Sequence, residues 1–264
     1  MIKSVVFRGS IVYAGPLIYN NYGTENFLKN TIVKLRKWFD GEVIVSTWKG
    51  EEEHLHGIDG IDKIVYTDDP GPGPVQHIKR QVLSYINGVK ESSGDEILVS
   101  RTDISYDEDI FKYLNTLKQN DNSFKVFDER IITGNMMTIF PDNGTEEPSH
   151  FRVCDWFQLG NRNDILKWGD IYEMITDVKG ICTEQIWSLS VLKKNYDDKI
   201  NINDISNINQ YGWDYILNNF RILNMKSTLK SYNNNWSFQP EFLQCYLTED
   251  MYNKKYIEKY KEFK

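Results

Sequence analysis

The first 140 residues alternate short apolar segments with amphipathic ones, and this alternation limits the fold more than any other feature of the chain. Between the apolar segments, hydrophobic residues recur every three or four positions over 25–39 and 75–89, which is the period of a helix. Strands that alternate with helices in this way build a mainly parallel sheet with helices on its faces. We therefore predict an α/β fold. The strands are expected at residues 4–7, 43–47, 63–66 and 96–100.

The second half of the chain is less regular and is expected to end in helices. Its Asn-rich stretches are interpreted as ordered polar loops and not as a linker, so the sequence predicts a single domain over residues 1–264. Further strand signals lie near 124–127, 136–140 and 153–159, and helices are predicted around 110–117 and over 164–172, 183–193 and 211–220.

Composition excludes several classes of protein. The chain has 31 Lys and Arg against 38 Asp and Glu, a formal net charge of −7, whereas a protein that binds nucleic acid nonspecifically carries the opposite balance. Three cysteines are too few and too scattered for a disulfide framework, which favours a reduced, cytoplasmic location. No run of about 18 apolar residues could cross a membrane. The Lys- and Tyr-rich residues 252–264 predict a solvated terminal helix or, alternatively, peripheral contact with a membrane surface.

Several catalytic motifs are missing from the sequence. It contains no Gly-x-x-x-x-Gly-Lys-Ser/Thr loop, no Gly-x-Gly-x-x-Gly fingerprint and no Gly-x-Ser-x-Gly turn. Walker-type nucleotide hydrolases, nicotinamide enzymes of the Rossmann type and α/β-hydrolases therefore lose most of their support.

The most informative segment is an apolar strand that ends directly in charged residues. Arg101, Thr102 and Asp103 follow it at the carboxyl edge of the predicted sheet, where open α/β sheets bind ligands. Asp103 could hold a divalent cation that bridges two phosphates, and Arg101 could pair with phosphate oxygens. An Asp that caps the next helix, with the Arg paired beside it, explains the segment equally well.

Other cations and one carboxylate extend this pattern. Arg8, Gly9 and Ser10 follow the predicted first strand and offer a cation with a close backbone approach. Arg80 lies on the 75–89 helix, away from its apolar face, where it could reach a diphosphate. Asp155 stands in an apolar, aromatic run, where a carboxylate is costly unless it is paired or used. That is typical of a general base with a raised pKa.

These segments, in this order, resemble the WavE-type lipopolysaccharide-synthesis proteins, a glycosyltransferase-like family of bacteria and some large viruses. The resemblance covers about residues 2–190. It is carried by Ser46-Thr47-Trp48, Asp69-Pro70-Gly71, Arg80-Gln81, Arg101-Thr102-Asp103, Asp155-Trp156-Phe157 with Gly160, and Thr183-Glu184-Gln185.

The resemblance implies a GT-A-like fold that transfers a sugar from a nucleotide-diphospho-sugar, with a UDP-sugar favoured, to a hydroxyl of a glycan acceptor. The sugar would be a hexose or a deoxyhexose. Residues 1–140 would bind the donor, and residues 141–264 would bind the acceptor and end in helices.

The resemblance and the residues together suggest roles for particular residues. Asp103 would stand at the metal motif and hold Mn²⁺ or Mg²⁺, although this sequence has only the last of the two usual aspartates. Asp155 or Glu184 would be the catalytic base. Trp156, Phe157 and Trp187 could give the acceptor ring an apolar face, although plain core packing is the better interpretation for at least one of the three. The donor would be bound by Arg8, Gly9, Ser10, Thr47, Arg80, Arg101, Thr102 and Asp103.

Two other functions remain open at this point. A sugar nucleotidyltransferase would need a Gly-rich first loop that carries Lys or Arg, of which Arg8-Gly9-Ser10 is a poor version. A non-catalytic carbohydrate-binding module would suit the 14% content of aromatic residues but would leave the Arg-Thr-Asp strand end without a purpose.

Overall fold

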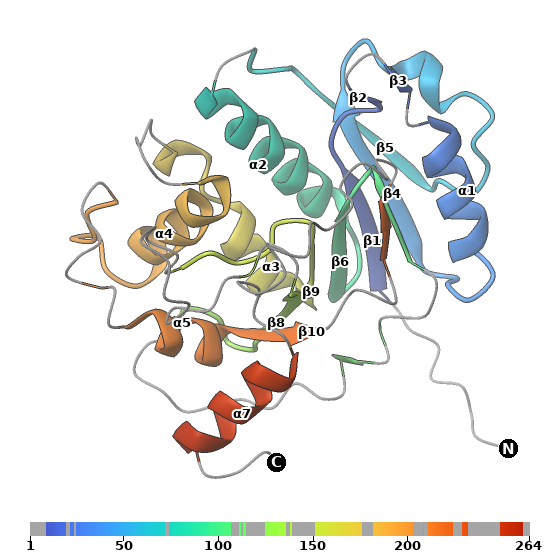
Figure 1. Cartoon of the computed structure of the whole chain (residues 1–264). Coiled ribbons are helices and arrows are strands. Elements are labelled where there is room, and N and C mark those ends of the chain that lie inside the picture. The colour runs from blue at the N-terminus through green and yellow to red at the C-terminus, as the bar shows by residue number, and fades with distance from the viewer. Residues whose placement is uncertain are drawn as a thin grey trace, which may run out of the picture.

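The computed structural model describes most of the chain. The described residues are 9–19, 22–23, 25–71, 74–106, 111, 113–114, 125–135, 138, 151–175, 182–202, 208, 211–223, 229–231 and 249–260. Figure 1 labels their main elements. The strands are β1 (Gly9–Ala14), β2 (Ile18–Tyr19), β3 (Tyr22–Gly23), β4 (Glu42–Trp48), β5 (Lys63–Thr67), β6 (Glu96–Arg101), β7 (Ile104–Tyr106), β8 (Ile131–Gly134), β9 (Phe157–Asn161), β10 (Phe220–Leu223) and β11 (Leu229–Ser231). The helices are α1 (Glu25–Leu35), α2 (Pro74–Glu91), α3 (Arg162–Gly169), α4 (Thr183–Asn195), α5 (Gly212–Asn219) and α7 (Glu249–Tyr260), with 3₁₀ turns at Glu52–Leu55 and Tyr172–Met174.

Seven of the described strands form one sheet in the order β10-β8-β9-β6-β1-β4-β5. Strand β9 runs antiparallel to β6 and β8, and the other neighbouring strands are parallel. The prediction of an α/β fold with a mainly parallel sheet is therefore confirmed. Strands from before and after residue 140 lie in the same sheet.

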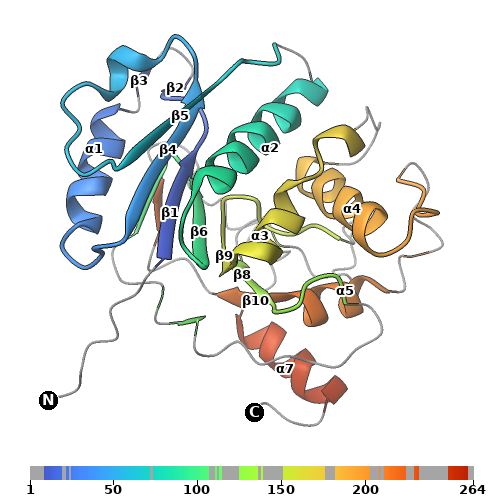
Figure 2. The same cartoon turned by 180° about the vertical axis from the view of Figure 1, so that it is seen from behind.

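Both faces of the sheet are covered. Side chains alternate along β1, so that Ile11 and Tyr13 pack into the core beneath α1, while Val12 and Ala14 pack into the core beneath α2. Helix α1 lies on one face, and α2, α3 and α4 lie toward the other, as the opposite views show (Figures 1 and 2). This burial on both faces explains why the strands read as continuous apolar runs.

Stacked aromatic rings hold α3 and α4 against α2. The Trp168 and Trp187 rings stack at 5.7 Å between centroids, and Tyr85 meets Trp187 edge to face at 5.5 Å. The indole nitrogen of Trp187 donates to the carbonyl of Trp168 at 2.7 Å. Trp187 and Phe157 are fully buried, so for these two the alternative of core packing holds and the expectation of an apolar face for an acceptor sugar is wrong.

Helix α7 is docked on the body of the protein. The hydroxyl of Tyr252 donates to the carbonyl of Phe220 in β10 at 2.6 Å and accepts from Nη1 of Arg130 at 2.9 Å. The Arg130 guanidinium also lies over the ring of Tyr256 at 5.0 Å. One face of the predicted solvated helix is therefore buried. Within the described residues, no helix is both long and apolar enough to cross a membrane.

The first strand differs from its prediction. It spans Gly9–Ala14, and the predicted residues 4–7 lie outside the described residues, as does Arg8. Gly9 and Ser10 therefore begin the strand, at the amino edge of the sheet, where the Ser10 hydroxyl donates to Glu42 and accepts from the amide of Gly94. They were predicted to follow a strand at the carboxyl edge, beside a bound donor, and this placement is wrong, because the apolar run that pairs with β4 and β6 comes after them, at residues 11–14.

Other differences are smaller. No strand forms at 125–127, because the amides of Val126 and Phe127 bond to the side chain of Asn219 instead of to a neighbouring strand. Strand β8 follows at Ile131–Gly134. The expected strand at 136–140 lies outside the described residues except for Thr138, and the expected helix around 110–117 is described only at residues 111, 113 and 114.

Close packing between α2 and the sheet generates a stability prediction. A methyl group on Gly88 would lie 2.4 Å from Cγ1 of Val12 and 2.9 Å from Cβ of Ser46. Gly88→Ala should therefore destabilise the fold by about 1–3 kcal/mol in urea unfolding, although Ala favours a helix. Gly160→Ala is the control, since a methyl group there meets its neighbours at 3.6 Å or more. Equal stability of the Gly88 variant and the wild type would contradict this packing.

Candidate functional site

The carboxyl ends of the parallel strands lie along one edge of the sheet. Residues 15–17 follow β1 there, 49–51 follow β4, 68–71 follow β5 and 102–103 follow β6. Because β9 runs in the opposite direction, residues 152–156 enter the sheet at this same edge. Sequence segments that are far apart thus meet along one line.

Arg101 and Asp103 form a two-point ion pair at the end of β6. Nε of Arg101 donates to Oδ1 of Asp103 at 2.9 Å, and Nη2 donates to Oδ2 at 2.7 Å. The guanidinium also lies over the ring of Trp156 at 5.5 Å. The carboxylate is buried, while the Arg101 side chain keeps 27% of its surface exposed. The pair therefore fixes a partly exposed cation at the edge.

Thr102 and Thr47 are occupied in holding the loops of this edge together. The Thr102 hydroxyl donates to the carbonyl of Pro16 at 2.7 Å, and the amide of Gly15 donates to the carbonyl of Ser46 at 3.0 Å. Gly15 has a φ of +130°, which favours glycine. The Thr47 hydroxyl donates to Glu51. Thr102 thus fixes the loop after β1 directly, and Thr47 orients the carboxylate of Glu51.

Glu51 is a residue of this edge that the sequence analysis missed. Its carboxylate is buried and accepts from the amide of Leu17 at 3.1 and 3.2 Å as well as from Thr47. It therefore joins the loop after β4 to the loop after β1. The sequence did not single out Glu51, because it belongs to the Glu-rich run 51–53, and an acidic run predicts only a solvated loop.

Arg80 and Asp69 form a second two-point pair, which ties the loop after β5 to α2. Nε and Nη2 of Arg80 donate to the two oxygens of Asp69, and Oδ1 also accepts from the amide of Gly71 at 2.9 Å. The Arg80 guanidinium holds the pKa of the Asp69 carboxyl below its usual value. Like Arg101, Arg80 is a cation whose orientation is set by a carboxylate of the chain.

Asp155 lies buried between Gln81 of α2 and the end of β6. Nε2 of Gln81 donates to Oδ2 of Asp155, whereas Oδ1 has no hydrogen-bond partner among the described residues. Burial and the nearby charge of Glu184 raise the pKa of Asp155 to about 6, and Arg101 and Gln81 act in the opposite direction. An unpaired oxygen on a buried carboxylate is costly, which points to a use for it.

Glu184 is the second carboxylate near Asp155. It lies in the first turn of α4, is buried, and has its Oε2 3.8 Å from Nε of Arg152. Its charge also raises the pKa of the Cys182 thiol, which burial brings to about 12. Within the described part of the chain, both predicted bases thus lie close enough to interact, and Glu184 is paired with Arg152.

The described residues do not fit a metal ion held by protein ligands alone. Both oxygens of Asp103 already accept from Arg101. No group of three His, Cys, Asp or Glu side chains in the described part of the chain could hold a metal. Arg80 and Arg101 are two partly exposed, oriented cations at this edge.

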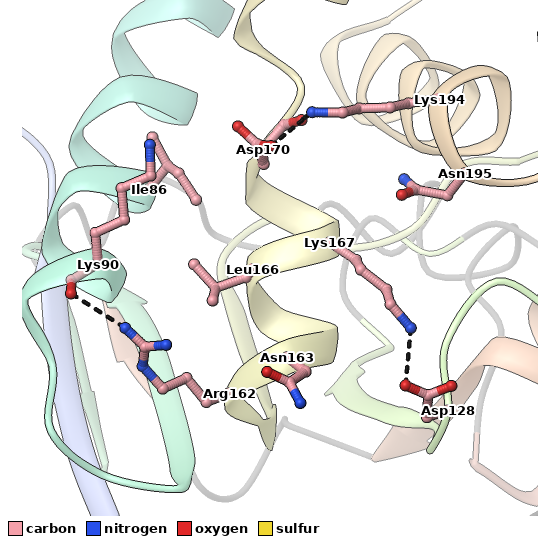
Figure 3. Close-up of a pocket in the computed structure, with 10 residues that line it drawn as sticks. All are labelled: Ile86, Lys90, Asp128, Arg162, Asn163, Leu166, Lys167, Asp170, Lys194 and Asn195. Atoms are coloured by element: carbon pink, nitrogen blue, oxygen red, sulfur yellow. Dashed lines mark hydrogen bonds and ion pairs between the residues drawn. The ribbon is translucent and has the colours of Figure 1, made fainter.

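A hollow of about 660 Å³ lies elsewhere, between α2, α3 and α4 near the amino edge of the sheet (Figure 3). Three of its cations have partners within the chain: Arg162 donates to the carbonyl of Lys90, Lys167 to Asp128, and Lys194 to Asp170. None of the predicted site residues lines it. We therefore place the candidate site at the carboxyl edge and not in this hollow.

The sequence of the chain assigns it to a family. Residues 9–230 match the WavE family, which is described as WavE lipopolysaccharide synthesis, and the chain therefore belongs to this family. No curated protein matches the chain.

Solved structures give weaker likenesses. HddC from Yersinia pseudotuberculosis has a TM-score of 0.37 at 13% identity, covering 61% of this chain and 80% of HddC. The 4-diphosphocytidyl-2C-methyl-D-erythritol synthase from Anaerococcus prevotii has a TM-score of 0.37 at 16% identity, covering 69% and 82%. The galactosyltransferase LgtC, solved with donor and acceptor sugar analogs, has a TM-score of 0.42 at 13% identity, covering 67% and 68%.

The burial of Asp155 predicts a dependence of stability on pH. An unfolded Asp has a pKa near 3.9, so a folded pKa of about 6 favours the protonated folded state. This contribution is complete below pH 4 and is lost as the pH rises through 6. Asp155→Asn removes it, so the variant should gain up to about 3 kcal/mol relative to wild type between pH 4 and pH 7.5.

Urea unfolding of both proteins at the two pH values measures this gain. The control is Asp68→Asn, which removes a carboxylate that is 83% exposed and should change by less than about 1 kcal/mol. A stability difference between Asp155→Asn and wild type that is the same at both pH values would contradict the raised pKa.

Proposed function

We propose that the protein is a glycosyltransferase of lipopolysaccharide synthesis, which moves a sugar from a nucleotide-diphospho-sugar to a hydroxyl of a growing glycan. Membership of the WavE family supports the process. The observation that carries the reaction type is Asp155, a buried carboxylate with a pKa near neutrality and one oxygen without a described partner. It lies at the sheet edge where α/β folds bind ligands.

The donor would lie across the carboxyl ends of β1, β4, β5 and β6, with a UDP-sugar as the favoured class. When the bond between C1 of the sugar and the diphosphate breaks, negative charge develops on the leaving diphosphate. The guanidiniums of Arg80 and Arg101, already oriented by Asp69 and Asp103, would stabilise this charge. Oriented cations of this kind do not need to reorganise during the reaction, which is the main source of such stabilisation.

Asp155 would take the proton from the acceptor hydroxyl as that oxygen attacks C1. A base works best when its pKa is close to the working pH, and the value of about 6 meets this condition. Glu184, paired with Arg152, would help to keep the pKa of Asp155 high, because its charge opposes a second charge nearby. Trp156, which is nearly buried beside Arg101, would line the site next to the base.

The first alternative function, a sugar nucleotidyltransferase, loses its best candidate motif. Gly9 and Ser10 lie at the amino edge of the sheet, and no Lys or Arg occurs in the sequence from residue 9 to 28, which includes the loop that follows β1. A release of pyrophosphate from a nucleoside triphosphate would nevertheless identify this activity in the same assay. A carbohydrate-binding module would bind glycans without releasing any nucleotide.

Two isosteric variants separate the candidate bases. Asp155→Asn should lower the rate of nucleoside diphosphate release in the presence of acceptor by about 10²–10⁴-fold while leaving donor affinity unchanged. Glu184→Gln keeps the volume of the side chain and should retain a much larger share of the activity. Because Asp155→Asn removes a buried charge that costs stability at neutral pH, the variant is expected to stay folded under the assay conditions, which its urea unfolding checks. Equal rates for Asp155→Asn and wild type would reject Asp155 as the base.

A further inference from the structure

Gln81 donates a hydrogen bond to Asp155 and can therefore affect both the orientation and the pKa of this carboxylate. It lies on α2, one residue after Arg80, so consecutive side chains of this helix reach the loop after β5 and the buried carboxylate. Its amide donates to Oδ2 of Asp155, and the other oxygen, Oδ1, remains buried without a described partner. The two oxygens of the carboxylate are therefore not equivalent.

From this geometry we propose that Gln81 is a positioning residue, which holds Oδ2 of Asp155 so that Oδ1 alone receives the proton of the acceptor hydroxyl. This rests on the proposed function for the identity of the reaction. In that step the acceptor oxygen bonds to C1 of the sugar, its proton moves to Oδ1, and the bond from C1 to the diphosphate oxygen breaks with its electron pair leaving on the nucleoside diphosphate.

The same hydrogen bond also affects the protonation of Asp155. A donor on Oδ2 stabilises the ionised carboxylate, whereas burial and Glu184 disfavour it. The groups that face Asp155 are Arg101 from the end of β6, Glu184 from the start of α4, Cys154 beside it in the chain and Gln81 from α2, and Arg152 balances Glu184. Among these, Gln81 is the neutral donor and can be removed without changing the net charge of the site.

Gln81→Met removes the donor and keeps the length of the side chain. The matched control is Asn87→Leu, which removes another half-buried amide of the same helix, one that donates to the Thr67 hydroxyl at 3.0 Å and does not contact Asp155. Both replacements favour a helix, so a change that appears only in Gln81→Met reports on the contact with Asp155.

The first measurement is the titration of the Asp155 carboxyl carbon by ¹³C NMR, with the signal assigned from its absence in Asp155→Asn. Gln81→Met should raise the pKa of Asp155 by about one pH unit, a tenfold change in its protonation equilibrium, and Asn87→Leu should leave it unchanged. This measurement does not depend on catalysis. An unchanged pKa in Gln81→Met would overturn the inference even if the enzyme is active.

The second measurement is the pH profile of sugar transfer. In Gln81→Met the acid limb of kcat should move upward with the titrated pKa, and kcat at its plateau should fall about tenfold while KM for the donor stays the same. A profile identical to that of wild type would also overturn the inference. If the wild type transfers no sugar but the titration still shifts, the proposed function fails, while the control of Asp155 by Gln81 stands.

Discussion

Strand β9 runs against the direction of its neighbours, and the candidate site depends on that reversal. In a wholly parallel sheet, the residues that precede β9 would lie at the amino edge, far from the ends of the other strands. The reversal instead places Asp155 and Trp156 beside Arg101, which donates its backbone amide to the carbonyl of Trp156 at 3.2 Å. A buried carboxylate thus lies next to an oriented cation, as a reaction that moves a proton and expels an anion requires.

Carboxylates of the chain have two different tasks along this edge. Asp69 and Asp103 each hold both oxygens against an arginine, so their role is to fix a cation. Glu51 accepts backbone and hydroxyl hydrogens and fixes the loops. Asp155 differs from these three, because only one of its oxygens has a described hydrogen-bond donor. This unpaired oxygen, more than sequence position, distinguishes Asp155, the proposed base, from the three structural carboxylates.

Much of the architecture could be predicted from local sequence patterns. The alternation of apolar strands and amphipathic helices predicted the mainly parallel sheet, and the Arg101–Asp103 strand end and Asp155 were found because charge interrupts apolar runs. The sequence alone left open whether Arg101 pairs with Asp103 or binds phosphate oxygens. What failed was the placement of Gly9 and Ser10: they were expected after a strand, but they begin β1, whose pairing with β4 and β6 cannot be read from the local sequence. Glu51 and Gln81 could not be assigned roles, because Leu17, which Glu51 joins to its own loop, is 34 residues away from it and Asp155 is 74 residues away from Gln81.

The most direct test of the account is the melting temperature of the protein with UDP, GDP, CDP and ADP, each with and without Mn²⁺. A nucleotide at about 100 times its Kd adds roughly 2.7 kcal/mol to the free energy of unfolding, which is a shift of several degrees. The account predicts such a shift with one nucleotide, UDP being favoured, that is present without Mn²⁺ and is reduced in Arg80→Ala. A shift that requires Mn²⁺ would contradict the assignment of the diphosphate to arginines, and no shift with any nucleotide would contradict the transferase itself.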